Sequence, residues 1–202
     1  MKTINELQTQ FLNNTYYKGI PTCKNPMDLW VYQEIIHEVQ PDVIIEIGVW
    51  KGGSTQWLAD NSNAYVIGID LMEHLKEWEG LTISTDKKMT YFKGDATEIF
   101  DSIKEHIEFR QKVGVLCNKV MVIEDSSHAY DNTLKCLQLY SPLVSVGSYY
   151  IVEDTIAPEL GYDLHPGLAV EDFLRDNDSF VVDRSREKYI TWNKGGYLKR
   201  VK

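Results

Sequence analysis

Residues 42–54 read DVIIEIGVWKGGS, and this stretch decides the fold. The apolar run 43–47 predicts a buried strand, and the glycines after it predict a tight turn into a helix. Glycine lets a backbone approach a ligand closely, and α/β proteins use such strand–turn–helix units to bind nucleotide-like cofactors. A glycine turn that only joins a strand to a helix would show the same pattern, and the spacing does not match G-x-G-x-x-G. The candidate cofactor-binding residues of this stretch are Glu46, Gly48, Gly52, Gly53 and Ser54.

Apolar runs alternate with helical patterns from residue 42 to the end, which predicts a seven-stranded, mostly parallel sheet with helices on both faces. We expect one domain over 1–202, with an N-terminal helical cap (1–40) and an α/β Rossmann-like core (41–202). Segment 71–88 is expected to be a helix or a mobile segment beside the site. The expected strands are 43–47, 64–69, 90–92, 119–124, 148–152, 180–183, and 190–192 with 196–201. The expected helices of the core are 54–60, 96–113, 130–140 and 168–177.

Composition excludes several classes of partner. The formal net charge is −9 and the pI is near 5.0, which opposes binding to nucleic acid. No apolar run approaches the roughly 18 residues of a membrane span, and residues 1–6 are not followed by a signal-peptide core. The three cysteines lack metal or redox spacing. We therefore expect a cytoplasmic protein without a membrane or nucleic-acid partner.

Acids stand at the ends of five consecutive predicted strands. The carboxyl ends of parallel strands form the ligand-binding edge of an open sheet, so this edge is expected to be the functional one. Asp70 lies 24 residues after Glu46, where an acid meets ribose hydroxyls in nucleotide-binding folds; a solvated acid at the start of a loop is the alternative. Asp95 follows a glycine and suits either an adenine amino group or the cap of the next helix.

Three of these acids predict a metal site. Asp125, Glu153 and Asp154 follow adjacent strands, and like charges that close cannot all stay ionised without a cation. Oxygen ligands without cysteine or histidine favour a hard ion such as Mg²⁺. The alternative is that the carboxylates are spread over the surface and paired with lysines.

His128 lies three residues after Asp125, beside the expected metal. Histidine is the residue type that most often accepts protons near neutral pH, and a metal makes a bound hydroxyl easier to deprotonate. We therefore interpret His128 as the candidate general base. A histidine that only packs in the core is the alternative.

The ordered series of these motifs resembles the cephalosporin hydroxylase-like family, which includes macrolide-sugar and rhamnosyl O-methyltransferases. The acid-x-glycine of residues 46–48 is also similar to the first motif of methyltransferases that use S-adenosylmethionine (SAM). The resemblance covers about residues 19–201. Its further motifs are Gly19-Ile20-Pro21, Lys24-Asn25-Pro26, Asp28, Tyr32-Gln33-Glu34, Asp125-Ser126-Ser127-His128, Tyr150-Ile151-Val152-Glu153-Asp154-Thr155, Pro166-Gly167, Ala169-Val170 and Phe173-Leu174.

The resemblance implies a class I SAM-methyltransferase fold, with Mg²⁺ on Asp125, Glu153 and Asp154 and with His128 as base. It implies a SAM- and Mg²⁺-dependent O-methyltransferase that acts on a hydroxyl of a sugar or sugar-bearing small molecule, and we expect a homo-oligomer. The hydroxylase of the family name is discounted, because iron oxygenases need two histidines and a carboxylate. Two alternatives are an NAD-dependent oxidoreductase and a non-catalytic module that binds a nucleotide or a glycan.

Overall fold

The computed structural model describes residues 3–71 and 89–202, and its centre is a seven-stranded sheet. The strand order is β5-β4-β3-β6-β7-β9-β8. All neighbours from β5 to β7 are parallel, and β9 is antiparallel to both β7 and β8. The sheet strands are β3 Val43–Ile47, β4 Tyr65–Asp70, β5 Met89–Lys93, β6 Val120–Glu124, β7 Tyr149–Val152, β8 Phe180–Val182 and β9 Tyr197–Arg200.

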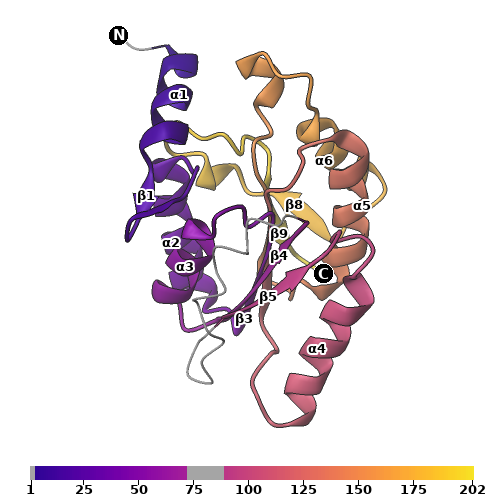
Figure 1. Cartoon of the computed structure of the whole chain (residues 1–202). Coiled ribbons are helices and arrows are strands. Elements are labelled where there is room, and N and C mark those ends of the chain that lie inside the picture. Colours follow the sequence, from indigo (N-terminus) through magenta and orange to yellow (C-terminus); the bar gives the residue numbers. More distant parts are fainter. Residues whose placement is uncertain (1–2, 72–88) are drawn as a thin grey trace.

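Helices cover both faces of this sheet (Figure 1). α1, α2 and α3 lie on one side, and α4, α5 and α6 lie on the other. The helices are α1 Ile4–Asn14, α2 Pro26–Val39, α3 Gly53–Asp60, α4 Phe100–Lys112, α5 Tyr130–Tyr140 and α6 Pro166–Arg175. Short 3₁₀ helices span Ser141–Leu143, Ala157–Leu160 and Arg184–Arg186. No helix in the described part of the chain is long and apolar enough to cross a membrane.

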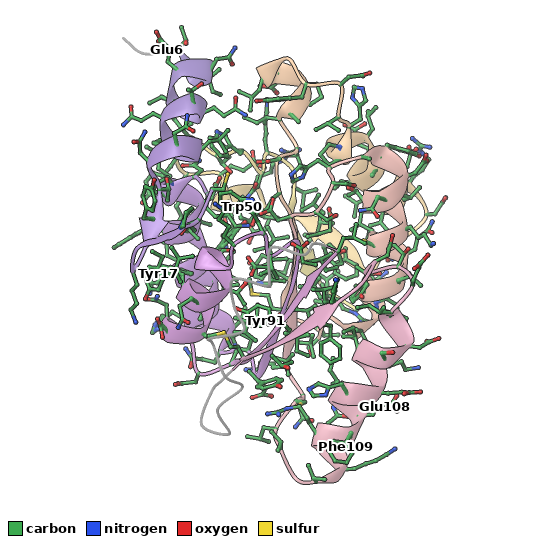
Figure 2. All side chains as sticks on the ribbon, viewed as in Figure 1. Glu6, Tyr17, Trp50, Tyr91, Glu108 and Phe109 are labelled. Atoms are coloured by element: carbon green, nitrogen blue, oxygen red, sulfur yellow. The ribbon has the colours of Figure 1, made fainter. Side chains whose placement is uncertain are left out.

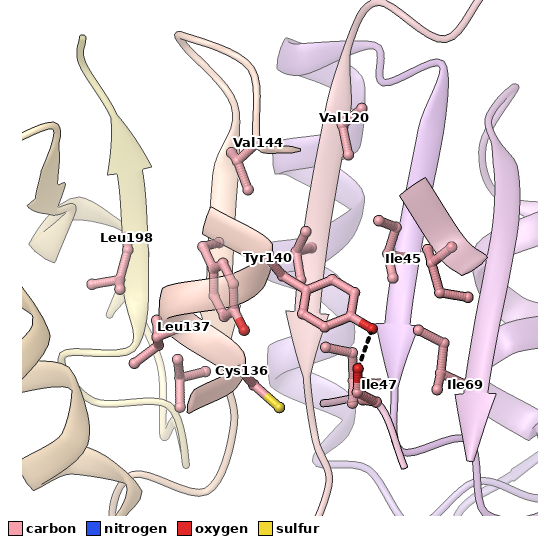
Figure 3. Packing of buried hydrophobic residues seen from close by; sticks show 14 of the residues in the cluster. Ile45, Ile47, Ile69, Val120, Cys136, Leu137, Tyr140, Val144 and Leu198 are labelled. Atoms are coloured by element: carbon pink, nitrogen blue, oxygen red, sulfur yellow. Dashed lines mark hydrogen bonds between the residues drawn. The ribbon is translucent and has the colours of Figure 1, made fainter. Parts of the chain in front are cut away.

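The two central strands are buried along their whole length, as their continuous apolar sequences require. Every residue of β3 and β6 is buried, because helices pack on both of their faces. Tyr140 of α5 lies in the core on the α4–α6 side, and its hydroxyl donates to the Ala96 carbonyl at 2.7 Å (Figure 3). This bond satisfies a buried polar group and fixes α5 against the segment that follows β5.

The N-terminal segment packs onto the core through α2. The buried side chains of α2 include Val31, Ile35 and Val39, which fall at helical spacing. A two-stranded hairpin, β1 Tyr16–Tyr17 and β2 Ile20–Pro21, precedes α2. Asn25 caps α2, since its side chain accepts from the Met27 amide, and Pro26 occupies the first helical turn.

The predicted α/β class, the mostly parallel seven-stranded sheet and the two helical layers are confirmed. β3 and α5 have the predicted bounds. The α4 helix begins at Phe100 instead of 96, since residues 96–98 form a turn, and α6 begins at Pro166. The expected segment 71–88 lies outside the described residues, apart from Leu71.

The predicted strand at 190–192 is wrong. The side chains near the start of α2 take the backbone groups that a sheet would need: Asn25 Nδ2 donates to the Ile190 carbonyl at 2.8 Å, and Asp28 accepts from the Trp192 amide at 3.0 Å. The Trp192 ring is buried against Phe11 of α1. Trp192 therefore packs against α1, whereas the Ile190 side chain is exposed.

Candidate active site

A cavity of about 500 Å³ opens at the carboxyl ends of β3, β4, β5 and β6. This volume is in the range of sites for cofactors and small ligands, and the location is the one that open parallel sheets use. Five of the predicted site residues line it: Gly48, Ser54, Asp70, Asp95 and Asp125. Residues not predicted from the sequence line it as well, among them Cys23, Trp50, Ser126 and Asn132.

The turn between β3 and α3 lies directly against the end of β6. Gly48 has φ +90°, and a Cβ there would lie 1.9 Å from the carbonyl oxygen of Asp125. Only glycine fits this approach. Gly52 precedes α3 in the left-handed conformation, and a Cβ on Gly53 would lie 2.4 Å from Thr22 Oγ1. Gly52 and Gly53 shape the turn and lie outside the cavity lining, so their contact with a cofactor stays a prediction.

Asp70 holds this turn from the neighbouring strand. Its Oδ2 accepts from the backbone amides of Val49, at 2.8 Å, and Trp50, at 2.7 Å. Trp50 lies on the turn at the edge of the cavity and has φ +47° (Figure 2). Asp70 therefore fixes the shape of the turn and also lines the cavity.

Asp95 caps the turn that leads into α4. Its Oδ1 accepts from the amide and the hydroxyl of Thr97, both at 2.8 Å, and these bonds hold the pKa of Asp95 below its ordinary value. The sequence allowed a cap of the next helix, but the N-cap of α4 is Ile99, so Asp95 caps only the turn before the helix. Asp95 also lines the cavity, so contact with an adenine group stays a prediction.

Glu46 points into the protein instead of into the cavity. Its side chain is fully buried, Oε2 accepts from the Thr55 hydroxyl, and Oε1 lies 3.8 Å from the Lys24 ammonium. Burial raises the pKa of Glu46 despite the attraction of Lys24. Its assignment as a cofactor ligand stays a prediction that this contact pattern does not support.

Asp125, which lines the cavity, forms a cluster with His128 and Asp154. Atoms of all three that can bind a metal lie within 4.8 Å of one another. His128 Nε2 lies 3.3 Å from Asp154 Oδ2 and 3.6 Å from Asp125 Oδ1. His128 has φ +56° and Asp154 has φ +53°, conformations that residues other than glycine rarely adopt. Such strain concentrates at functional sites.

Behind this cluster lies a buried lysine that the sequence analysis did not select. Lys24 Nζ contacts Asp125 Oδ2 closely and lies 2.5 Å from Glu153 Oε1. Burial opposes the charge of Lys24, but the attraction of Asp125, Glu153 and Glu46 outweighs it and raises the lysine pKa well above its ordinary value. Burial raises the pKa of Asp125 to about 6, against the attraction of Lys24 and His128.

The two carboxylates of the cluster fit a hard divalent cation. Asp125 and Asp154 offer two carboxylate oxygens on the open side of the cluster, and Mg²⁺ in proteins is often held by one or two carboxylates with water completing its shell. Their side chains are 19% and 31% exposed, so water and an acceptor have access to them. Glu153 faces Lys24, and its predicted role as a metal ligand stays a prediction.

Lys24 carried little signal in the sequence. A single lysine before a helix cap is usually a solvated residue, and its burial depends on carboxylates that are 101 and 129 positions away in the chain. The one indication was its place in the Lys24-Asn25-Pro26 motif of the resemblance. Cys23 and Trp50 were not selected either, because cavity lining depends on loop shape.

Curated rhamnosyl O-methyltransferases are similar to this chain along most of its length. The protein from Mycobacterium tuberculosis (strain ATCC 25618 / H37Rv) is 27% identical over 194 residues, which cover 92% of this chain and 78% of the relative. The protein from Mycobacterium leprae (strain TN) is 28% identical over 202 residues, with 93% and 84% covered.

Solved structures of CmcI share the fold. The form described with Mg and SAM is 26% identical, has a TM-score of 0.68, and is matched over 93% of this chain and 77% of that one. The apo form is 25% identical with the same TM-score, and 93% and 76% are covered. The rhamnosyl O-methyltransferase/CmcI family model matches residues 9–201, so the resemblance drawn from the sequence is confirmed. The chain belongs to the rhamnosyl O-methyltransferase/CmcI family.

Proposed function

We propose that this protein transfers the methyl group of SAM to a hydroxyl of a sugar or sugar-bearing small molecule, with Mg²⁺ bound beside the acceptor. One observation carries the proposal: Asp125 lines the large cavity and also belongs to the Asp125–His128–Asp154 cluster. A methyl donor in the cavity and an acceptor at the cluster would therefore be neighbours. Membership of the family favours methyl transfer over the NAD-dependent oxidoreductase.

SAM would occupy the cavity, with its ribose near Asp70 and its methionine part near the start of α3. A carboxylate oxygen can accept from ribose hydroxyls, and Ser54 stands in the first turn of α3, where backbone amides favour an anionic group. Gly48 has no side chain and leaves the cavity floor open. The CmcI structure described with Mg and SAM supports this choice of cofactor.

Asp125 and Asp154 would hold Mg²⁺, with Glu153 as a further candidate ligand. A bound Mg²⁺ supplies Lewis acidity and orients oxygen ligands. The geometry that supports this assignment is the approach of the two carboxylates to within 4.8 Å of each other and of His128.

His128 would accept the proton of the acceptor hydroxyl at Nε2, which is the ring nitrogen that faces the two carboxylates. The hydroxyl oxygen forms a bond to the methyl carbon, the carbon–sulfur bond breaks, and S-adenosylhomocysteine leaves with the sulfur electron pair. Because the sulfonium is already activated, most of the rate comes from positioning and from exclusion of water.

The acceptor class is a deoxyhexose such as rhamnose, displayed on a glycoside. The support is the name of the two mycobacterial relatives, which are rhamnosyl O-methyltransferases. The decisive experiment incubates the purified protein with methyl-labelled SAM, Mg²⁺ and a panel of rhamnosides. Labelled product that disappears with Asp154→Asn supports the proposal, whereas SAM binding without transfer to any sugar would favour the non-catalytic module.

We also propose that the protein is cytoplasmic and that it forms a homo-oligomer. Cys23, Cys117 and Cys136, all within the described residues, are free thiols, which fits a reducing compartment. Tyr16 is 58% and Trp30 is 60% exposed, and exposed aromatic residues are common at protein interfaces. Light scattering measures the mass of the protein in solution. The mass of a monomer at micromolar concentration would contradict the proposed homo-oligomer.

A further inference from the structure

The Lys24 ammonium is enclosed by carboxylates. Its side chain is 4% exposed, and its nitrogen contacts Asp125 Oδ2, lies 2.5 Å from Glu153 Oε1 and lies 3.8 Å from Glu46 Oε1. An ammonium buried so completely is stable only among opposite charges. Lys24 is therefore a permanent cation on the inner side of the candidate active site.

The two oxygens of Asp125 face different partners. Oδ2 is held by Lys24, while Oδ1 lies on the side of His128 Nε2, which in turn lies 3.3 Å from Asp154 Oδ2. The contact with Lys24 therefore determines the rotation of the Asp125 carboxylate, and with it the direction of the oxygen that is left for an outer cation.

The backbone holds Lys24 firmly at this place. Asn25, the next residue, caps α2 by accepting from the Met27 amide, and its Nδ2 donates to Asp28 at 3.0 Å and to the Ile190 carbonyl at 2.8 Å. Cys23, the preceding residue, has φ +55°. The start of α2 is thus tied to the core directly after Lys24.

We propose that Lys24 is a positioning residue for the Mg²⁺ site: it anchors Asp125 through Oδ2, so that Oδ1 faces the cation. This inference rests on the proposed function. Residues that orient a metal ligand typically contribute about 10- to 100-fold to metal affinity. A lysine that merely adds charge would have the opposite effect, because a nearby ammonium repels Mg²⁺.

The two roles of Lys24 predict opposite changes in Mg²⁺ affinity, and this difference provides the test. Lys24→Met alone leaves the buried Glu46 and Glu153 and the partly buried Asp125 without the lysine counter-charge and can prevent folding. The informative comparison is therefore Glu153→Gln against Lys24→Met/Glu153→Gln, since the double variant has the wild-type net charge. Adding Lys24→Met removes a positive charge, so electrostatics alone predicts tighter Mg²⁺ binding, and loss of the anchor predicts weaker binding.

Titration calorimetry with MgCl₂ measures the affinity, and SAM affinity without Mg²⁺ reports the integrity of the fold. We expect the double variant to bind Mg²⁺ about 10- to 100-fold more weakly than Glu153→Gln. SAM affinity should stay within about twofold, because Lys24 does not line the SAM cavity. The matched control is Lys18→Met, which removes a 63% exposed ammonium paired with Asp60.

Equal or tighter Mg²⁺ binding by the double variant would overturn the inference, even if its melting temperature fell, because a purely structural lysine changes stability and not the metal affinity of the folded protein. If the wild type does not bind Mg²⁺, the assignment of Mg²⁺ in the proposed function is wrong instead. The two failures are therefore distinguishable.

Discussion

Asp70 combines a structural bond with a predicted contact to the cofactor. Asp70→Asn keeps the size of the side chain but removes the charge that would attract ribose hydroxyls. We expect SAM affinity to fall by about 1.5–3 kcal/mol, which is roughly 10- to 150-fold, as measured by calorimetry. Because Asp70 also accepts from Val49 and Trp50, the melting temperature must be measured in parallel. Unchanged SAM affinity in a folded variant would show that Asp70 does not bind the ribose of SAM.

His128 is tested by a substitution that its backbone tolerates. Asparagine adopts positive φ more readily than alanine, so His128→Asn removes the base without the additional strain. We expect kcat to fall by about 10²- to 10⁴-fold, with SAM affinity nearly unchanged. His165→Asn, at a more exposed histidine beside Asp163, is the control. A folded His128→Asn variant with the wild-type rate would assign His128 a structural role.

At the scale of elements, substitution of two glycines tests the contact between the β3–α3 turn and the end of β6. Gly48→Ala combines positive φ with a Cβ 1.9 Å from the Asp125 carbonyl oxygen, whereas Gly147→Ala has φ +85° and open space. We expect a loss of about 1–2 kcal/mol of unfolding free energy at Gly147, and of about 2–5 kcal/mol at Gly48. Thermal unfolding measures both. Equal losses would mean that the turn can move away from β6.

The antiparallel edge of the sheet depends on Asp183, which follows β8. Its carboxylate accepts from the Tyr149 hydroxyl of β7 and from the Ser185 hydroxyl, both at 2.6 Å. Burial alone would raise the pKa of Asp183, but these hydrogen bonds and the charge of Arg186 hold it below its ordinary value. A lowered pKa stabilises the folded state at pH values above the unfolded pKa of about 3.9, and this contribution is lost as the pH falls through the lowered pKa.

Asp183→Asn should therefore lower the unfolding free energy at pH 7 by about 1–3 kcal/mol and should flatten the loss of stability below pH 4. Thermal unfolding from pH 7 to pH 3 checks both effects. Asp178→Asn, at an exposed ion pair with Lys202, should change stability little. A parallel acid profile for wild type and Asp183→Asn would contradict the assignment.

Elements with strong local signals could be predicted from the sequence. β3 is a continuous apolar run followed by glycine, and α5 is periodic from Tyr130 to Tyr140, so both bounds are local properties. Residues 190–192 look equally apolar, but Asn25 and Asp28 take their backbone hydrogen bonds. That competition comes from residues more than 160 positions away and leaves no trace in the local pattern.

At the scale of the whole molecule, the sequence predicted which edge of the sheet carries the site, but it did not predict which side chains contact one another there. The rule that ligands bind at the carboxyl ends of parallel strands selected Asp70, Asp125 and Asp154. It also selected Glu46 and Glu153, but it cannot distinguish carboxylates that face the cavity from those that face a buried lysine. Asp125 faces both, and which carboxylates contact Lys24 depends on packing of the N-terminal segment against the sheet.

Removal of the cation tests the assembled site. If Mg²⁺ binds the folded state and not the unfolded state, it raises the unfolding free energy of the protein by about 2.7 kcal/mol at a concentration 100-fold above Kd. We expect a chelator to lower the melting temperature and to abolish methyl transfer, and excess Mg²⁺ to restore both. Full turnover in excess chelator would exclude the metal from the reaction.

The pair of Lys24 and Glu153 joins residues 129 positions apart, and this separation bears on the order of folding. Closing so long a loop is entropically costly, so contacts of this kind form after local helices and turns. A growing chain that has not yet released β7 contains Asp125 and His128 but neither Asp154 nor the Glu153 partner of Lys24. The proposed cation site therefore cannot form before β7 and the residues directly after it have been released, so ion uptake follows the local folding steps.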